Sequence, residues 1–213
     1  MTYSVKEIFY TLQGEGAQSG RAAVFCRFAG CNLWSGLEGD RLSALCQFCD
    51  TDFVGTDGKR GGKYENARDL VDALEEVWNL SCPSNSSKYA VLTGGEPGLQ
   101  VDISLVEALH ISGYEVGIET NGTQKLPNGI DWICVSPKEG AELVLATGDE
   151  LKVVFPQGGL DISKLEQLDF RHYFVQPKDC AEKDENIQKA IEFCMNNPVW
   201  RLSLQTHKIV GLP

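Results

Sequence analysis

Three cysteines, Cys31, Cys46 and Cys49, are spaced as C-x14-C-x2-C, a pattern that could bind a metal centre. The surrounding segment offers no fourth thiol or histidine to complete a structural zinc site, which usually has four ligands. Iron–sulfur clusters of the four-iron type are also held by thiolates, and three thiolates leave one iron open for chemistry. Cys26 lies in an apolar run and is expected in the core. The spacing favours a cluster, with a zinc-knuckle module as the alternative.

Further polar clusters stand directly after predicted strands. They are Thr93-Gly94-Gly95-Glu96-Pro97, Glu119-Thr120-Asn121-Gly122, Ser136-Pro137-Lys138, Gln176-Pro177-Lys178-Asp179 and Gln205-Thr206-His207-Lys208. Arg27 lies ahead of Cys31 and is the only guanidinium that we expect near the cysteine segment. It could be an ordinary surface arginine, or its planar fork could bind a carboxylate through two parallel hydrogen bonds. Clusters placed in this way are typical of active sites built at the C-terminal ends of barrel strands.

Short β-rich runs alternate with amphipathic helices along the chain. The predicted strands are 23–28, 89–93, 115–119, 132–136, 150–155, 173–176 and 201–205, and the predicted helices are 66–78, 103–112 and 185–196. This alternation predicts βαβ units and a parallel sheet. Seven strands are too few for a complete barrel of about 250 residues. We therefore predict an α/β fold, an open and partial TIM-like (β/α) barrel with mostly parallel strands.

Local signals support the first two helices. Asn66 and Asp102 each stand where they could cap the helix that follows. The residues expected to face inward from these helices are Leu70, Val71, Leu74, Val77, Trp78, Leu105, Val106 and Leu109. The polar stretch 81–88 and the glycine-rich stretch 54–62 are predicted to be surface loops.

Composition restricts the class of protein. The chain has 213 residues, 42% of them hydrophobic, which suits a single domain over 1–213 with a sizeable core. A net charge of −11 without basic runs argues against a nucleic-acid partner and favours a small-molecule substrate. No apolar run approaches the roughly 20 residues of a membrane span, and the first residues do not form a signal peptide. Cysteine usage favours a reducing cytoplasm.

The cysteines together with the Gly-Gly-Glu-Pro motif resemble the radical S-adenosylmethionine superfamily, in which that motif holds the methionine amino group. The usual cysteine spacing there is C-x3-C-x2-C, so this chain carries an insertion at about residues 32–45. The longer spacing, residues 10–16, Cys49-Asp50-Thr51 and the terminal Gln205–Lys208 segment are similar to the 7-carboxy-7-deazaguanine synthase family. The similarity extends from Ile8 to Pro213.

The resemblance implies a carbon–nitrogen lyase that converts 6-carboxy-5,6,7,8-tetrahydropterin to 7-carboxy-7-deazaguanine, in queuosine and 7-deazapurine biosynthesis. It implies a [4Fe–4S] cluster, S-adenosylmethionine and Mg²⁺ as cofactors. A deoxyadenosyl radical would remove hydrogen from carbon 6 of the pterin, and the ring would contract with loss of ammonia. The implied partners are the pterin, a flavodoxin or ferredoxin as electron donor and a second copy in a homodimer, with no nucleic acid and no membrane.

The resemblance also implies a set of site residues. The cluster ligands would be Cys31, Cys46 and Cys49, and Thr51 would bind Mg²⁺. The residues implied to bind substrate are Leu12, Gln13, Gly14, Glu15, Arg27, Thr93, His207 and Pro213, the last through a terminal carboxylate. The residues implied to bind S-adenosylmethionine are Phe48, Cys49, Asp50, Gly95, Glu96, Glu119, Ser136, Pro137, Lys138, Gln176, Pro177, Lys178 and Asp179. No side chain is implied to be catalytic beyond the cofactor radical.

Other interpretations remain open for individual residues and for the whole chain. Gly94-Gly95 and residues 12–16 could be simple turns, and His207 could be structural or solvated. Glu119 could pair with a basic group in the core, and Phe48 could shield the cluster from water. For the chain, the alternatives are a glycyl-radical activating enzyme, an S-adenosylmethionine cyclase of another pathway, and the zinc-knuckle module.

Overall fold

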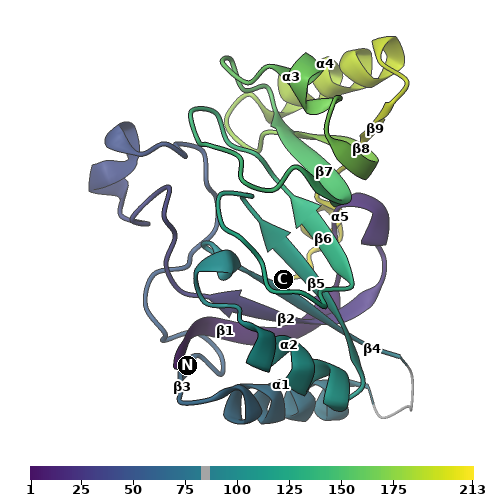
Figure 1. Cartoon of the computed structure of the whole chain (residues 1–213). Coiled ribbons are helices and arrows are strands. Elements are labelled where there is room, and N and C mark those ends of the chain that lie inside the picture. Colours follow the sequence, from purple (N-terminus) through teal and green to yellow (C-terminus); the bar gives the residue numbers. More distant parts are fainter. Residues whose placement is uncertain (83–86) are drawn as a thin grey trace.

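The computed structural model describes residues 1–82 and 87–213. Within them, nine strands form one sheet in the order β3-β1-β2-β4-β5-β6-β7-β8-β9. The strands are β1 (Tyr3–Leu12), β2 (Ala22–Phe28), β3 (Gly62–Tyr64), β4 (Lys88–Gly94), β5 (Tyr114–Thr120), β6 (Trp132–Val135), β7 (Thr147–Phe155), β8 (Asp169–Pro177) and β9 (Trp200–Leu202). From β2 to β9 all neighbours are parallel. The sheet curves without closing, with β3 and β9 at its two edges, which confirms the predicted open barrel (Figure 1).

Two strands were not predicted. β1 runs antiparallel to β2 and to the short edge strand β3. A bulge between Val5 and Glu7 changes which side chains face the helices. After it, Ile8 points into the helix-covered core, while Phe9 and Thr11 line the concave side. Because the bulge interrupts the period-two pattern, alternation alone does not reveal this strand.

The helices cover the outer face of the sheet in two groups. They are α1 (Ala67–Ser81), α2 (Ile103–Ile111), α3 (Ile162–Leu165) and α4 (Lys183–Asn196), whereas the last helix, α5 (Thr206–Val210), lies at the cavity on the concave side. α1 packs on β1 and β2, α2 on β5, and α4 on β8 and β9 (Figure 1). Asn66 and Asp102 cap α1 and α2 as predicted, with side chains that accept the N–H groups of Asp69 and Leu105. The predicted inward-facing residues of both helices are buried.

The end of the chain corrects one prediction. The strand predicted over 201–205 is shorter, because β9 ends at Leu202 and residues 206–210 form α5. The loop predicted over 54–62 is largely confirmed, with β3 beginning at Gly62. Ser81 ends α1 and Lys88 begins β4, and residues 83–86 of the loop predicted over 81–88 lie outside the described residues. No helix of the described chain has the length and apolar character required to cross a membrane.

The segment after β1 spans the opening between the two ends of the sheet. The N–H of Ala17 donates to the carboxylate of Glu150 on β7, at 2.8 Å. The N–H of Gly16 donates to the hydroxyl of Ser203 just after β9, at 3.0 Å. Strand β1 thereby brings residues 12–16 onto the concave side, opposite the loops that follow the parallel strands.

Candidate active site

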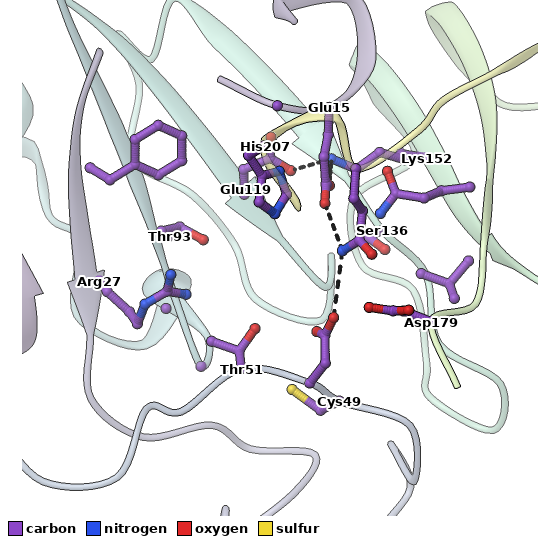
Figure 2. Close-up of a pocket in the computed structure, with 18 of the residues that line it drawn as sticks. Glu15, Arg27, Cys49, Thr51, Thr93, Glu119, Ser136, Lys152, Asp179 and His207 are labelled. Atoms are coloured by element: carbon purple, nitrogen blue, oxygen red, sulfur yellow. Dashed lines mark hydrogen bonds and ion pairs between the residues drawn. The ribbon is translucent and has the colours of Figure 1, made fainter. Parts of the chain in front are cut away.

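A cavity of about 400 Å³ lies on the concave side of the sheet, at the C-terminal ends of the parallel strands. All residues assigned from the sequence to the cluster, to Mg²⁺ and to the substrate line it. The residues assigned to S-adenosylmethionine line it too, except Glu96 and Pro137. Arg27, Thr51 and Thr93 lie on one side of the cavity, with Lys152 and Asp179 on the other (Figure 2). The structure therefore brings nearly all the residues assigned from the sequence together in one cavity, and the roles assigned to them stay predictions.

Two glycines at the end of β4, Gly94 and Gly95, place Cys31 beside this strand end. A side chain at Gly94 would begin 2.4 Å from the carbonyl oxygen of Phe28, and one at Gly95 would begin 2.1 Å from that of Gly30. The backbone N–H of Gly95 donates to the Phe28 carbonyl, at 3.2 Å. Both glycines are required because the backbone leading into Cys31 passes against them. A simple turn does not account for this contact.

The three cysteines face the cavity without gathering around one point. Among the described residues, no three His, Cys, Asp or Glu side chains lie close enough together to hold one metal ion. A cluster spreads its thiolates over different irons, so its ligands need not converge as the ligands of one ion do. The Cys46 thiol lies in hydrogen-bond contact with Cys49, which lowers the pKa of Cys49 and raises that of Cys46. A thiolate at Cys49 is the form that binds iron, so the donor set fits the cluster.

Lys138 adds a cation on this side of the cavity. Its ammonium donates to the carbonyl and hydroxyl oxygens of Ser136, at 2.6 and 2.7 Å. Burial lowers the pKa of Lys138, while the nearby Cys46 and Cys49 act in the opposite direction. The Lys138 charge lowers the pKa of Cys46 and Cys49, in opposition to the burial that raises the pKa of both thiols.

Glu96, assigned from the sequence to S-adenosylmethionine, lies behind the cavity wall in the structure. Its side chain is fully buried, and its carboxylate accepts hydrogen bonds from the Thr120 hydroxyl at 2.6 Å and the Asn121 N–H at 2.7 Å. The N–H of Gly98 is a third donor, at 2.8 Å. The carboxylate thus ties the Gly-Gly-Glu-Pro turn to the end of β5 and does not line the cavity. Gly94 and Gly95 are the residues of this motif that line the cavity.

Arg27 is oriented by its neighbours on β1. Glu7 lies directly opposite it in the antiparallel register and accepts a hydrogen bond from the Arg27 Nε, at 2.9 Å. Two positions along, the cross-strand pair Phe9 and Phe25 stacks with ring centroids 5.4 Å apart. Among the described residues neither Nη group of Arg27 has a hydrogen-bond partner. The guanidinium is therefore fixed through one edge and can offer two N–H groups to a carboxylate in the cavity.

Replacing Arg27 with lysine should weaken binding of a carboxylated substrate by roughly ten- to hundred-fold, because a bidentate charge-assisted pair of about 1.5–3 kcal/mol is lost. Cleavage of S-adenosylmethionine uncoupled from substrate should persist, since Arg27 lies on the opposite side of the cavity from Asp179 (Figure 2). Titration of substrate into the reconstituted protein measures the first effect, and deoxyadenosine release measures the second. Arg60→Lys, a surface pair with Glu76, is the matched control. Unchanged substrate affinity in Arg27→Lys would remove Arg27 from the site.

Lys152 is a central residue that the sequence analysis missed. It projects from β7 into the cavity wall, its side chain is 4% exposed, and its ammonium lies 2.8 Å from Glu15 and 2.9 Å from Glu119 (Figure 2). Burial alone would lower the pKa of Lys152, but the acidic groups around it raise it well above the usual value. Burial alone would raise the pKa of Glu15, but other groups, above all the Lys152 charge, lower this pKa to about 2.

The ion pairs of Lys152 with Glu15 and Glu119 connect the loop after β1 to the sheet. The amide nitrogen of Gln13 donates to the second oxygen of Glu119, at 3.0 Å. The Gln13 amide oxygen accepts the N–H of Glu15, at 3.2 Å. The basic partner foreseen as one alternative for Glu119 is thus Lys152. Residues 12–16 form a hydrogen-bonded wall of the cavity, not a flexible turn.

The segment after β9 closes the cavity from the remaining side. The N–H and the hydroxyl of Thr206 donate to the Gly14 carbonyl, at 2.9 and 2.8 Å. A side chain at Gly14 would collide with the His207 ring, which begins 2.1 Å away. Burial lowers the pKa of His207, so the imidazole is neutral near pH 7. The Thr11 hydroxyl donates to the backbone oxygen of Pro213, at 3.3 Å, which places that residue at the cavity.

Lys208 joins this closing segment to the side assigned to S-adenosylmethionine. Its ammonium lies 2.6 Å from Asp50 and 2.5 Å from Asp179. The Gln205 amide donates to Glu15, at 3.1 Å. Within the Gln205–Lys208 motif, only His207 was predicted to contact a ligand. A lysine and an amide beside that histidine were signals that could have been used.

One further correction concerns Arg27, which is not the only guanidinium near the cysteine segment. Arg41, inside the insertion, donates to the carbonyl oxygens of Gln47 and Cys49. The chain folds back on itself between Cys31 and Cys46 and brings Arg41 against Cys49. The spacing of residues along the sequence does not indicate this contact.

An open β/α sheet whose cavity combines three cysteines with a Gly-Gly-Glu-Pro turn defines a radical S-adenosylmethionine enzyme, which uses a [4Fe–4S] cluster and S-adenosylmethionine. Comparison with known proteins narrows this class. The 7-carboxy-7-deazaguanine synthase of Bradyrhizobium diazoefficiens is 58% identical over 212 residues, and that of Caulobacter vibrioides is 55% identical over 213 residues. Each comparison covers 100% of both chains. The chain belongs to the 7-carboxy-7-deazaguanine synthase family.

The fold comparison agrees with this assignment. The crystal structure of QueE from Escherichia coli matches with a TM-score of 0.71 and 28% sequence identity, over 97% of this chain and 95% of that one. No model of a protein family matches the chain. Full-length relatives of one kind confirm the family predicted from the motifs and leave the glycyl-radical and zinc-knuckle alternatives without support.

Proposed function

We propose that this chain converts 6-carboxy-5,6,7,8-tetrahydropterin to 7-carboxy-7-deazaguanine, with loss of ammonia, as an enzyme of queuosine or related 7-deazapurine biosynthesis. The observation that carries the proposal is that the three cysteines and Arg27, whose Nη groups can bind a carboxylate, line the same cavity. A pterin carboxylate is an appropriate partner for the unpaired edge of that guanidinium. The relatives named for this product support the choice of substrate.

The cluster would be held by Cys31, Cys46 and Cys49. When bound, the cluster and S-adenosylmethionine supply the radical that removes a hydrogen atom from the substrate. The side chains of the protein would bind and orient the substrate and the cofactors and would exclude water from the cavity. The residues that would surround S-adenosylmethionine are Phe48, Cys49, Asp50, Gly95, Glu119, Ser136, Lys138, Gln176, Pro177, Lys178 and Asp179, all of which line the cavity. Glu96 would act behind this set by fixing Gly95.

The substrate would lie between the Arg27 wall and the loop after β1. Leu12, Gln13, Gly14, Glu15, Arg27, Thr93, His207 and Pro213 would contact it. Glu15 carries a lowered pKa and stays ionised, so it can accept N–H groups of an aminopyrimidine ring. Burial of His207 and closure by α5 would limit water, which protects radical intermediates from side reactions.

The proposal also covers the setting of the enzyme. A flavodoxin or ferredoxin would supply the electron, and the protein would work in the cytoplasm as a homodimer. Residues 1–213 would form one catalytic domain with an insertion at 32–45, which the continuous sheet supports.

The decisive test is anaerobic reconstitution with iron and sulfide, followed by incubation with reductant, S-adenosylmethionine and the carboxypterin. Mass spectrometry should detect 7-carboxy-7-deazaguanine and deoxyadenosine. Deoxyadenosine without conversion of the pterin would contradict the proposed substrate while leaving the class of enzyme intact.

Magnesium should raise turnover, and Thr51→Ala should increase the Mg²⁺ concentration needed by about tenfold or more, because a ligand oxygen is lost at the substrate. Thr51→Ser keeps the hydroxyl and should resemble the wild type. Iron content should be equal in all three proteins, which separates the Mg²⁺ effect from loss of the cluster. Full wild-type activity in excess chelator, with the cluster intact, would contradict a role for Mg²⁺.

A further inference from the structure

The insertion between the first two predicted cluster ligands is a folded unit. Trp34 is 7% exposed, and its ring meets the buried Phe53 edge-on, with centroids 5.6 Å apart. At the other end of the insertion, the N–H groups of Leu45 and Cys46 donate to the carbonyl of Leu33, at 3.1 and 3.3 Å. Both ends are therefore anchored beside the segment that carries Cys46.

One arginine in this unit reaches back to that segment. Arg41 lies in the short 3-10 helix η2 (Glu38–Ser43), in the part of the insertion that projects from the sheet (Figure 1). Its Nη1 donates to the carbonyl oxygens of Gln47 and Cys49, at 3.0 and 3.1 Å. One nitrogen thus binds two carbonyl groups that flank a single residue, Phe48.

The guanidinium is held in this orientation by two other contacts. Its Nε and Nη2 donate to the carboxylate of Glu38, at 2.7 and 2.5 Å. Its central carbon lies 4.0 Å from the ring centroid of Trp34, in a cation–π contact. Arginine meets these demands because its planar fork can bind a carboxylate, stack on a ring and bind carbonyl groups at once; lysine has no such fork.

The orientation of the peptide groups has a consequence for the sulfur atoms. The N–H of Phe48 belongs to the same peptide group as the Gln47 carbonyl, so while that carbonyl points to Arg41 the N–H points the opposite way, where it acts as a donor to the Cys46 sulfur and lowers its pKa. Hydrogen bonds to the sulfurs of a cluster stabilise it and set its reduction potential. Peptide groups that rotated freely would not keep this arrangement.

We propose that Arg41 is a positioning residue for the cluster: by holding the Gln47 and Cys49 carbonyls, it fixes the peptide segment that presents Cys46 and Cys49. Supplying this brace is the contribution of the insertion. The inference rests on the cluster ligands given under the proposed function, so the test includes Cys46→Ala to check that assignment separately.

The experiment compares Arg41→Lys, Arg41→Gln and the control Arg68→Lys, which alters an exposed ion pair with Asp72 on α1. Hydrogen–deuterium exchange is measured on the full-length, cluster-loaded protein under anaerobic conditions. The amides of residues 46–51 should exchange faster in both Arg41 variants, on the order of tenfold, because two charge-assisted hydrogen bonds are lost. Iron should also be released faster to a chelator, and Arg68→Lys should match the wild type in both measurements.

Each outcome bears on the proposal. Wild-type exchange in both Arg41 variants would overturn it. A normal Arg41→Lys with a defective Arg41→Gln would show that charge alone matters, which contradicts bracing by the fork. Faster exchange without faster iron release would show that Arg41 orders the peptide segment without affecting the cluster, which would also overturn the proposal. Retention of iron in Cys46→Ala would instead refute the ligand assignment.

Discussion

Alanine in place of Cys31, Cys46 or Cys49 should abolish the brown chromophore and reduce iron per chain to background. Three thiolates are the minimum set for a four-iron cluster with one open iron, so none can be spared. Deoxyadenosine formation should be lost together with the cluster, because cleavage of S-adenosylmethionine needs its electron. Absorption spectra, iron and sulfide assays and deoxyadenosine release measure the three effects on anaerobically reconstituted protein.

Two other cysteines provide the controls. Cys26 is fully buried in the core under α1, and Cys180 is exposed beyond β8. Cys26→Ala should cost stability but keep the cluster, and Cys180→Ala should keep both. A colourless Cys26→Ala together with a brown Cys31→Ala would show that the ligands have been assigned wrongly.

The sequence was most informative where chemistry and local structure coincide. Asn66 and Asp102 were identified as caps from residue type and position, and short-range rules of this kind hold because the partner lies within one turn. The positions of the polar clusters after the strands also predicted a shared cavity correctly. Parallel strands place their C-terminal ends along one edge, so order along the chain becomes proximity in space.

Contacts between segments distant in the sequence could not be predicted from residue type and position. Strand β1 was missed because its bulge breaks the alternation, although its aromatic and β-branched residues favour a strand. Arg41 lies against Cys49 only because the insertion folds back on itself. Glu96 was assigned to the cofactor from its motif, and only the positions of Thr120 and Asn121 show that its carboxylate is already engaged.

Lys152 could be predicted in part: the sequence indicates an unusual charged position but not its partners. Glu150 and Lys152 are two charged residues at alternate positions in a strand of otherwise apolar character, so they share one face. Charged residues are rarely fully buried unless paired, so this pattern signals either a solvated face or a functional cavity. The sequence does not identify the partners, because Glu15 arrives from a loop more than a hundred positions away.

Replacing Lys152 with methionine should have a large effect on stability. It would leave the Glu15 and Glu119 carboxylates in the cavity wall without their cation, a change that typically costs about 3–5 kcal/mol. For a chain of this size, that corresponds to a fall in Tm of about 6–20 °C. Thermal unfolding of the anaerobically reconstituted protein measures it. Lys164→Met is the control, because Lys164 is 79% exposed and its distance to Asp161 is 3.4 Å.

The pH dependence of this effect separates lost charge from lost packing. In the wild type, Lys152 lowers the pKa of Glu15 to about 2, so the pair stabilises the fold above the unfolded pKa of about 4.3 and loses this as pH falls toward 2. Without Lys152, burial raises the pKa of Glu15 above its unfolded value, and the variant loses stability as pH rises. The difference in Tm between wild type and variant should therefore be larger at about pH 7 than at about pH 4, where the wild type begins to lose the ion pair and the Glu15 carboxyl of the variant is protonated. Adding Glu15→Gln to Lys152→Met should recover part of the loss, and a deficit independent of both pH and Glu15 would show that Lys152 acts through packing alone.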